Sequence, residues 1–171
     1  IASEQNAPGI YLAAWGFTSA WRGAEVQLST DGGVTYTSQT LISKATTGGF
    51  TTNALAAPVL LNQIDPAGFF TVQLTHGKTL SSVTDNQMLA GSNLCAVKST
   101  TGWEVLQFGV ATLVGTDLYK LTKLLRGQFD TARYSGLLGA GHNIGDPFVL
   151  ITKSTLFFID QPQADVNSAT T

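Results

Sequence analysis

The sequence is short of charge. Asp, Glu, Lys and Arg make up only 12% of its 171 residues, about half of the fraction usual in soluble globular domains. The formal net charge is −2, and the nine basic residues are scattered along the chain. Nucleic-acid binding needs a patch of Lys and Arg to neutralise phosphates, so we expect no nucleic-acid partner. Because each charge buried at an interface carries a desolvation cost, this composition favours a domain packed in a large assembly or an extracellular β protein.

Cysteine and long apolar runs are also scarce. Cys95 is the one cysteine, which excludes an intrachain disulfide. We expect it to be a small buried hydrophobe beside Leu94 and Val97. No stretch approaches the ~18 apolar residues of a membrane-spanning helix, and the longest candidate, residues 55–61, contains Pro58. We therefore expect no membrane insertion.

The composition of the two ends differs from that of the middle. Residues 1–9 and 161–171 are polar, contain proline and show no apolar periodicity, which predicts linkers. Residues 10–160 are long enough for one domain of ordinary size. The chain starts with Ile1 and shows no signal peptide. We therefore expect a single β domain, cut from a longer polypeptide, between two linkers.

Alternation of apolar and polar residues recurs through the middle of the chain, and helical periodicity is scarce. Successive side chains of a strand point to opposite faces, so this pattern predicts half-buried strands. The clearest hairpin joins Glu25–Ser29 to Val34–Thr37 through Asp31-Gly32-Gly33, whose glycines supply positive φ angles. Further strands are predicted around 70–74, 106–110 and 119–126, with a last hairpin of 148–150 and 156–159 turning at Lys153-Ser154.

One short helix and two long loops complete the predicted architecture. Thr84 and Gln87 have the spacing of a helix capping box. The loops cover residues 44–67 and 128–146, and long ordered loops in compact domains are usually functional or interfacial. We predict an all-β fold, either a sandwich or a partly open barrel of about eight strands with two long loops.

Glu104 and Asp146 are the one pair of carboxylates worth testing as a catalytic pair. A glycosidase needs two carboxylates about 5 to 9 Å apart in a cleft. Arg126 lies on an adjacent predicted strand, however, and an uncompensated charge among apolar strands costs several kcal/mol. Its guanidinium can bind a carboxylate through two parallel N–H donors, so it could pair with Glu104, with Asp146 or with both. We therefore predict that Arg126 ties the Glu104 strand, its own strand and the His142–Asp146 loop together, and that the chain is not an enzyme.

The histidines predict no metal site. His76 and His142 are the only two, and neither has the spaced Cys or His partners that zinc requires. Ser135 could complete a triad with His142 and Asp146, but it lacks the Gly-x-Ser-x-Gly elbow that exposes a nucleophile. A histidine whose hydrogen bonds are satisfied within a loop is the better interpretation of His142, and no cofactor is implied.

Trp15 and Trp21 are candidates for a binding surface. They flank Gly16 near the first predicted hairpin, and exposed aromatic rings stack on the apolar faces of sugars and are enriched at interfaces. Packing in the core is the alternative for both. Large exposure of either side chain would favour the binding role.

Several short motifs follow one another in a recognisable order. They are Trp21-Arg22-Gly23-Ala24, Asp31-Gly32-Gly33, Glu104-Val105-Leu106-Gln107-Phe108, Leu124-Leu125-Arg126-Gly127, and His142 followed by Gly145-Asp146-Pro147-Phe148-Val149-Leu150. In this order, over about residues 20–152, the chain resembles an internal domain of phage tail-tip proteins. These are the baseplate-hub or host-specificity proteins of siphophages, prophages and gene transfer agents.

The resemblance implies a structural part of the virion tail, made in the bacterial cytoplasm. Its partners would be other tail proteins, copies of itself in the assembly, and a host receptor or glycan. The alternative is a carbohydrate- or receptor-binding β module that uses the tryptophans. An isolated chain of that kind would bind glycans, whereas an assembly domain would not.

Overall fold

The computed structural model describes residues 8–59, 61–75, 77–136 and 141–160. Within these ranges the chain is all-β, as expected, with ten strands, one short α-helix and one 3-10 turn. The described part of the predicted domain, residues 10–160, divides into two compact units. One consists of Phe17–Ser19 and Thr47–Ile151. The other consists of Ala20–Thr46 with the described residues of Ile1–Gly16 and Thr152–Thr171.

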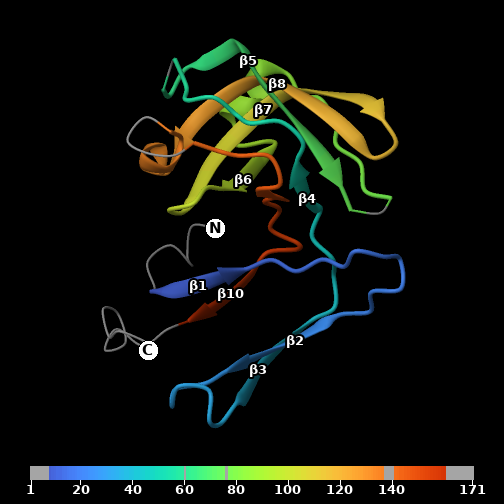
Figure 1. The fold of residues 1–171 in the computed structure, drawn as a ribbon, viewed down its shortest axis with the longest axis vertical. Coiled ribbons are helices and arrows are strands. Elements are labelled where there is room, and N and C mark those ends of the chain that lie inside the picture. Colours follow the sequence, from blue (N-terminus) through green and yellow to red (C-terminus); the bar gives the residue numbers. More distant parts are fainter. Residues whose placement is uncertain (1–7, 60, 76, 137–140, 161–171) are drawn as a thin grey trace. The chain divides into compact units, whose positions relative to one another are not determined.

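The first unit is a closed antiparallel barrel of six strands (Figure 1). Around the barrel the strands follow the order β4 (Gly48–Thr51), β5 (Ile64–Leu74), β8 (Leu118–Gln128), β7 (Trp103–Gly115), β6 (Leu94–Lys98) and β9 (Pro147–Leu150). β9 pairs with β4 to close it. Closure leaves the barrel no open sheet edge along these pairings. The expected sandwich or partly open barrel of about eight strands is thus a closed six-stranded barrel with separate smaller sheets.

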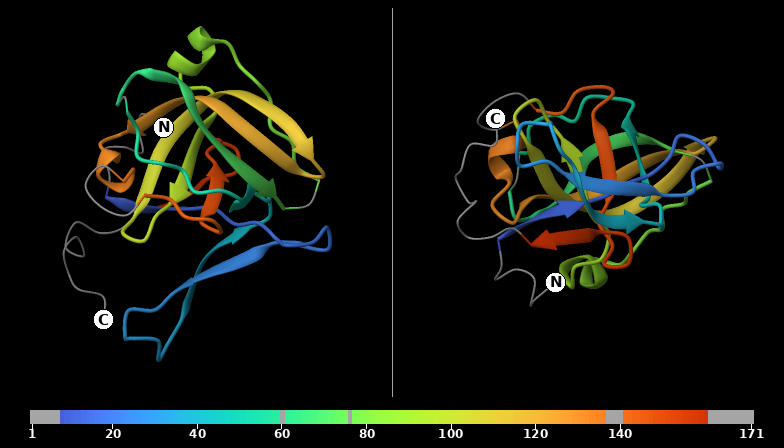
Figure 2. Two further views of the ribbon diagram at one scale, coloured as in Figure 1. Left: turned by 45° about the horizontal axis from the view of Figure 1, so that its top comes forward. Right: turned by 90° about the horizontal axis from the view of Figure 1, so that it is seen from below.

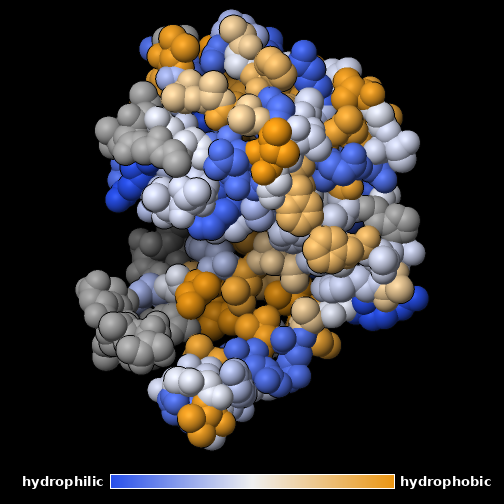
Figure 3. Space-filling model, in the orientation of Figure 1, coloured by the Kyte–Doolittle hydropathy of each residue, from blue (hydrophilic) through white to orange (hydrophobic). Residues whose placement is uncertain are grey.

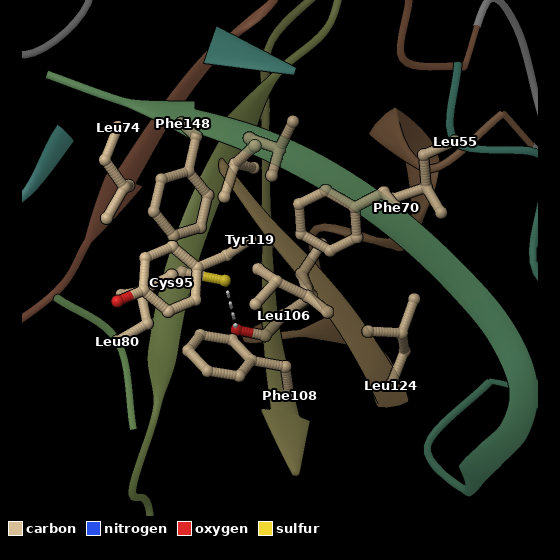
Figure 4. Packing of buried hydrophobic residues seen from close by; sticks show 13 residues of the cluster. Leu55, Phe70, Leu74, Leu80, Cys95, Leu106, Phe108, Tyr119, Leu124 and Phe148 are labelled. Atoms are coloured by element: carbon tan, nitrogen blue, oxygen red, sulfur yellow. Dashed lines mark hydrogen bonds between the residues drawn. The ribbon is translucent and has the colours of Figure 1, made fainter. Parts of the chain in front are cut away.

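The barrel interior is filled by the apolar members of the alternating patterns. Phe70 and Val72 of β5, Leu106 and Phe108 of β7, and Phe148 of β9 are completely buried. All five belong to one buried apolar cluster. The close view of Figure 4 shows Phe70, Leu106, Phe108 and Phe148 converging, with Cys95 among them. The Cys95 thiol donates a hydrogen bond to the Leu106 carbonyl. The prediction of a buried, small hydrophobic cysteine is confirmed.

Strands β7 and β8 form the longest hairpin, which curves around the barrel axis (Figure 2). The turn falls at Gly115-Thr116-Asp117, where Asp117 adopts a φ of 53°. Lys123 within β8 also has a positive φ, 55°, and its ammonium group pairs with Asp85 at 2.9 Å. No sequence signal indicates a positive φ for a lysine, so the periodicity predicts the strand but not its local distortion.

The predicted capping box is confirmed. Thr84 precedes α1 (Asp85–Leu89), its hydroxyl accepts the Gln87 amide, and the Gln87 side chain accepts the Thr84 amide. Gln107 of β7 donates its side-chain amide to the carbonyls of Met88 and Ser92. The short helix is therefore attached to the barrel wall.

The predicted loop 44–67 contains a strand. Gly48 and Gly49 lie in the range predicted as a loop, yet both belong to β4, which pairs with β5 and β9. A Cβ atom at Gly49 would lie 2.2 Å from the carbonyl oxygen of Gln73. The glycine is thus required for close approach of two strands, a role that a sequence does not distinguish from a turn.

The second unit contains two ribbons of two strands each. β1 (Gly9–Leu12) pairs with β10 (Phe157–Asp160), and β2 (Ala24–Leu28) pairs with β3 (Thr37–Ile42). The predicted last hairpin of 148–150 and 156–159 is therefore wrong, because β9 belongs to the barrel and β10 pairs with β1. The predicted linkers, residues 1–9 and 161–171, lie outside the described residues except for Pro8 and Gly9, and Gly9 begins β1.

The first predicted hairpin exists, but its turn is longer than expected. Val34, Thr35 and Tyr36 were assigned to the second strand, which begins only at Thr37. The Asp31 carboxylate accepts the amides of Val34 and Thr35 and the hydroxyls of Ser29 and Thr35. These bonds hold the two amides in the turn and keep them from pairing with β2.

Candidate functional site

The candidate site is a buried ionic network at the end of the barrel where β7 begins and β8 ends. Glu104 is the second residue of β7, and Arg126 lies two residues before the end of β8. The register places Val105 opposite Gln128, so the two strands bring Glu104 and Arg126 together inside the barrel end. Glu104 is 0% and Arg126 2% exposed.

Arg126 and Glu104 form a two-pronged ion pair. Nε of Arg126 donates to Oε1 of Glu104 at 2.7 Å, and Nη2 donates to Oε2 at 2.6 Å. Oε1 also accepts the backbone amide of Gly127 at 3.0 Å. Charge-assisted bonds in this parallel geometry are among the strongest in proteins. The pairing predicted for Arg126 with Glu104 is therefore present.

The rest of the guanidinium binds backbone carbonyls. Nη1 donates to Ala56 at 3.0 Å, and Nη2 donates to Ser135 at 3.2 Å. Arg126 thus connects β8 to the segment before β5 and to the segment after η2 (Ala132–Tyr134). These two contacts could not be predicted from the sequence, because a backbone carbonyl carries no residue-specific signal.

His142 completes the network from the loop before β9. Its Nε2 lies 2.6 Å from Oε2 of Glu104, and its Nδ1 lies 2.7 Å from the Lys98 carbonyl oxygen. The His142 carbonyl also accepts the Leu55 amide at 3.1 Å. A carbonyl can only accept, so Nδ1 carries a proton.

The electrostatics of the network favour the Glu104 carboxylate. Burial raises the pKa of Glu104, but hydrogen bonds from His142 and Arg126, together with their positive charges, outweigh burial and lower it. Burial, helped by the Glu104 charge, raises the pKa of the Cys95 thiol well above its usual value. Among the described residues, no buried side-chain nitrogen or oxygen lacks a hydrogen-bond partner. The buried polar side-chain atoms of the network are therefore all hydrogen-bonded.

Asp146 lies outside this network. Its carboxylate accepts the Asn143 amide at 2.6 Å, and its own amide donates to the Thr51 hydroxyl at 3.0 Å. It organises the turn of residues 143–146 and fastens that turn to β4. The loop is linked to Arg126 through His142 and Glu104, so the predicted three-way connection exists without the predicted part for Asp146.

The other candidate residues are placed as follows. The Ser135 hydroxyl donates to the Ala132 carbonyl and makes no bond to His142, so the two do not form a nucleophile and base. His76 lies outside the described residues. Within the part of the chain that is described, no group of three or more His, Cys, Asp or Glu residues could hold a metal ion, and no helix is long and apolar enough to cross a membrane.

The two tryptophans named as candidates for a binding surface are not fully exposed. Trp15 and Trp21 are both partly buried, and the Trp21 ring lies directly against Gly16. Trp103 is more accessible, at 39%. The Lys98 ammonium lies 5.9 Å from the centre of its ring. Trp103 is the first residue of β7, and its side chain points to the opposite side of the strand from the buried Glu104, which explains why Trp103 is exposed.

Comparison with known proteins gives one family. No curated protein matches the sequence. A family model described as "Rcc01698-like, C-terminal" matches residues 45–149, which include all six barrel strands except the last residue of β9 and contain Glu104, Arg126 and His142. The match covers more than half of the chain. The chain therefore belongs to the Rcc01698-like C-terminal domain family.

Proposed function

We propose that the chain is a structural domain of a phage or prophage-like tail-tip or baseplate-hub protein, with roles in tail assembly and host attachment. The proposal rests on the ordered sequence motifs. One observation strengthens it: the motifs supply Glu104, Arg126 and His142, and these three residues meet in one buried network. The residues that carry the resemblance are thus those that hold the barrel end together, as expected of a shared structural core.

The chemistry of the network supports a role without catalysis. Both Glu104 oxygens accept strong donors, and every nitrogen of the Arg126 guanidinium has an acceptor. Glu104 has no exposed surface, so neither water nor a substrate can reach its carboxylate. A pair of catalytic carboxylates would need to face each other across a cleft, whereas Asp146 is engaged in its own turn.

The surface is consistent with packing in an assembly. Large apolar side chains are well exposed on several loops, with Val59 at 89%, Phe17 at 77% and Ile144 at 71%. In the upper part of the face drawn in Figure 3, apolar residues lie among polar ones. Neighbouring subunits could cover these side chains with little desolvation of charge, because charged residues make up only 12% of the chain. Other tail proteins are the proposed partners.

Localisation on particles tests the proposal. Antibodies against the recombinant chain are applied to phage-like particles purified from the source bacterium, and bound antibody is located by gold labelling in electron microscopy. We expect label at the tail end, and antibody preadsorbed with the chain is the control. Particles without label, with the protein abundant in the cell lysate, would contradict a virion role.

A carbohydrate- or receptor-binding module is the alternative function. The partial burial of Trp15 and Trp21 gives it little support, but exposed Trp103 with Lys98 beside it offers one ring that could stack on a sugar. Calorimetric titration of the isolated chain with host-surface glycans separates the two roles. Binding that is lost in Trp103→Ala would favour the module over the assembly domain.

A further inference from the structure

Strand β3 is paired along one edge only. β2 occupies one side, and no backbone hydrogen bond joins the other side to any described residue. Thr37, Ser38, Gln39 and Leu41 are exposed. A row of unpaired N–H and C=O groups on an exposed strand is a template for pairing with another chain. A ribbon of two strands is also marginally stable alone and gains from further strands.

The sequence of β3 lacks most features that protect an exposed edge. No charged residue occurs from Gly32 to Ser43, and no proline or glycine occurs from Val34 onwards in that range. Natural edge strands are commonly guarded by lysine or proline. The neighbouring β2 differs because it carries Glu25. Tyr36 at 61% and Leu41 at 65% exposure add apolar surface beside the open edge.

A β-bulge divides the edge and limits the possible registers. Val26 pairs with Thr40, and Gln27 pairs with Ser38, so Gln39 is the extra residue. A bulge bends its strand and increases the local twist. A partner strand therefore fits only if it bends at the same place, which a second copy of β3 does when its own bulge lies opposite.

We propose that β3 pairs antiparallel with β3 of a second copy of this chain, about a two-fold axis at Gln39. In this register Ser38 lies beside the partner's Thr40, and Thr37 lies beside the partner's Leu41. The two ribbons then form one four-stranded sheet. The inference goes beyond the tail-protein role and does not depend on it, because pairing through β3 would occur in the isolated chain.

The charges favour a second copy at this edge. Antiparallel pairing of β3 with itself brings only uncharged residues together and closes as a symmetric dimer. Pairing of β2 with β2 would bring the two Glu25 carboxylates near each other, and like charges across strands are destabilising. Pairing of β3 with β2 is head-to-tail and does not close at two copies. Self-pairing of β3 also covers part of Leu41 and Tyr36.

Cross-linking at the axis tests the register. Residues opposite each other in an antiparallel pair have Cα atoms about 4.5 to 5.5 Å apart, which suits a disulfide. Gln39→Cys should therefore form a disulfide-linked dimer under mild oxidation. Gln27→Cys is the matched control, because Gln27 is an exposed glutamine on the other strand of the ribbon. This variant should form the disulfide-linked dimer far more slowly. The natural Cys95 is buried and should not contribute.

Sedimentation of the unmodified chain over a range of concentrations tests the dimer itself. We expect a monomer–dimer equilibrium that Gln39→Lys shifts at least ten-fold towards monomer and that Gln27→Lys leaves nearly unchanged. A chain that stays monomeric at every concentration would overturn the proposal. It would be overturned equally by a dimer that Gln27→Lys disrupts and Gln39→Lys does not, or by equal cross-linking rates for the two cysteine variants.

Discussion

Arg126 and Glu104 lie 22 positions apart in the chain and meet through two parallel hydrogen bonds of 2.7 and 2.6 Å inside the barrel end. Neither side chain is accessible to solvent beyond 2%. The pair fixes the end of β8 against the start of β7, and it reaches two further segments through the Ala56 and Ser135 carbonyls. The Arg126–Glu104 pair, together with His142, thus connects the segments around Ala56 and Ser135 to the barrel, although no strand pairing joins them to β7 or β8.

Removal of either Arg126 or Glu104 alone should lower the free energy of unfolding substantially. In Arg126→Met, Glu104 keeps only His142 and the Gly127 amide, and breaking a buried pair in this way typically costs about 3–5 kcal/mol. The double variant Glu104→Leu/Arg126→Met should lose less than the sum of the single losses, with a coupling of about 0.5–3 kcal/mol. Urea unfolding followed by circular dichroism gives the three free energies.

Lys123→Met is the matched control for that series. It removes the cation of an ion pair with Asp85 in which both side chains are about half-exposed, and such pairs contribute about 0–1 kcal/mol. A loss in Arg126→Met no larger than in Lys123→Met would show that the buried network does not hold the barrel end.

Acid should unfold the protein partly through Glu104. Its pKa is lowered below the ordinary value of 4.5 in the folded chain, so its carboxylate contributes stability above about pH 4.5 that is lost as pH falls through the lowered value. Unfolding free energies measured from pH 7 to pH 3 should fall more steeply for the natural chain than for Glu104→Gln. Parallel curves would contradict the assignment.

The sequence predicts only those contacts of the network that join two side chains, and not those that join a side chain to a backbone carbonyl. Arg126 needed a carboxylate because of its apolar neighbours, and Glu104 was correctly named as a partner. Asp146 was equally acceptable on charge, but its position three residues after Asn143 lets it bind a nearby amide at 2.6 Å instead. A hydrogen bond to a nearby amide orders little of the chain, so it can be as favourable for Asp146 as an ion pair with the distant Arg126. The sequence alone does not show which of the two forms.

The limits of fold prediction have a similar physical origin. Period two predicts β5, β7 and β8 because each buries one face in the barrel. It does not give the pairing partner of a short strand, so β9 and β10 were joined in one hairpin although the barrel takes β9 and β1 takes β10. Closure of the barrel depends on such long-range pairings, which leave no mark in local periodicity.

Asp31 should remain ionised far into the acid range. Hydrogen bonds from the Thr35 hydroxyl and amide, and then from Ser29 and Val34, lower its pKa to about 2 from 3.8. An NMR titration of its carboxyl carbon should show this value. Thr35→Val removes the largest contribution and should raise the pKa towards 3.8, whereas Thr40→Val on the same ribbon should leave it in place. An ordinary value in the natural chain would mean that the turn is not formed.

Gly49→Ala should destabilise the barrel at the junction of β4 and β5. The new methyl group would lie 2.2 Å from the Gln73 carbonyl oxygen and 2.9 Å from the Leu74 Cα atom. Both are backbone atoms of a paired strand and cannot move without breaking the ladder, so we expect a loss of about 1–3 kcal/mol in urea unfolding. Gly115→Ala is the control, because its nearest contact is 3.4 Å from a side chain, and it should change stability by less than about 0.5 kcal/mol. Equal stability of the two variants would show that β4 does not approach β5 so closely.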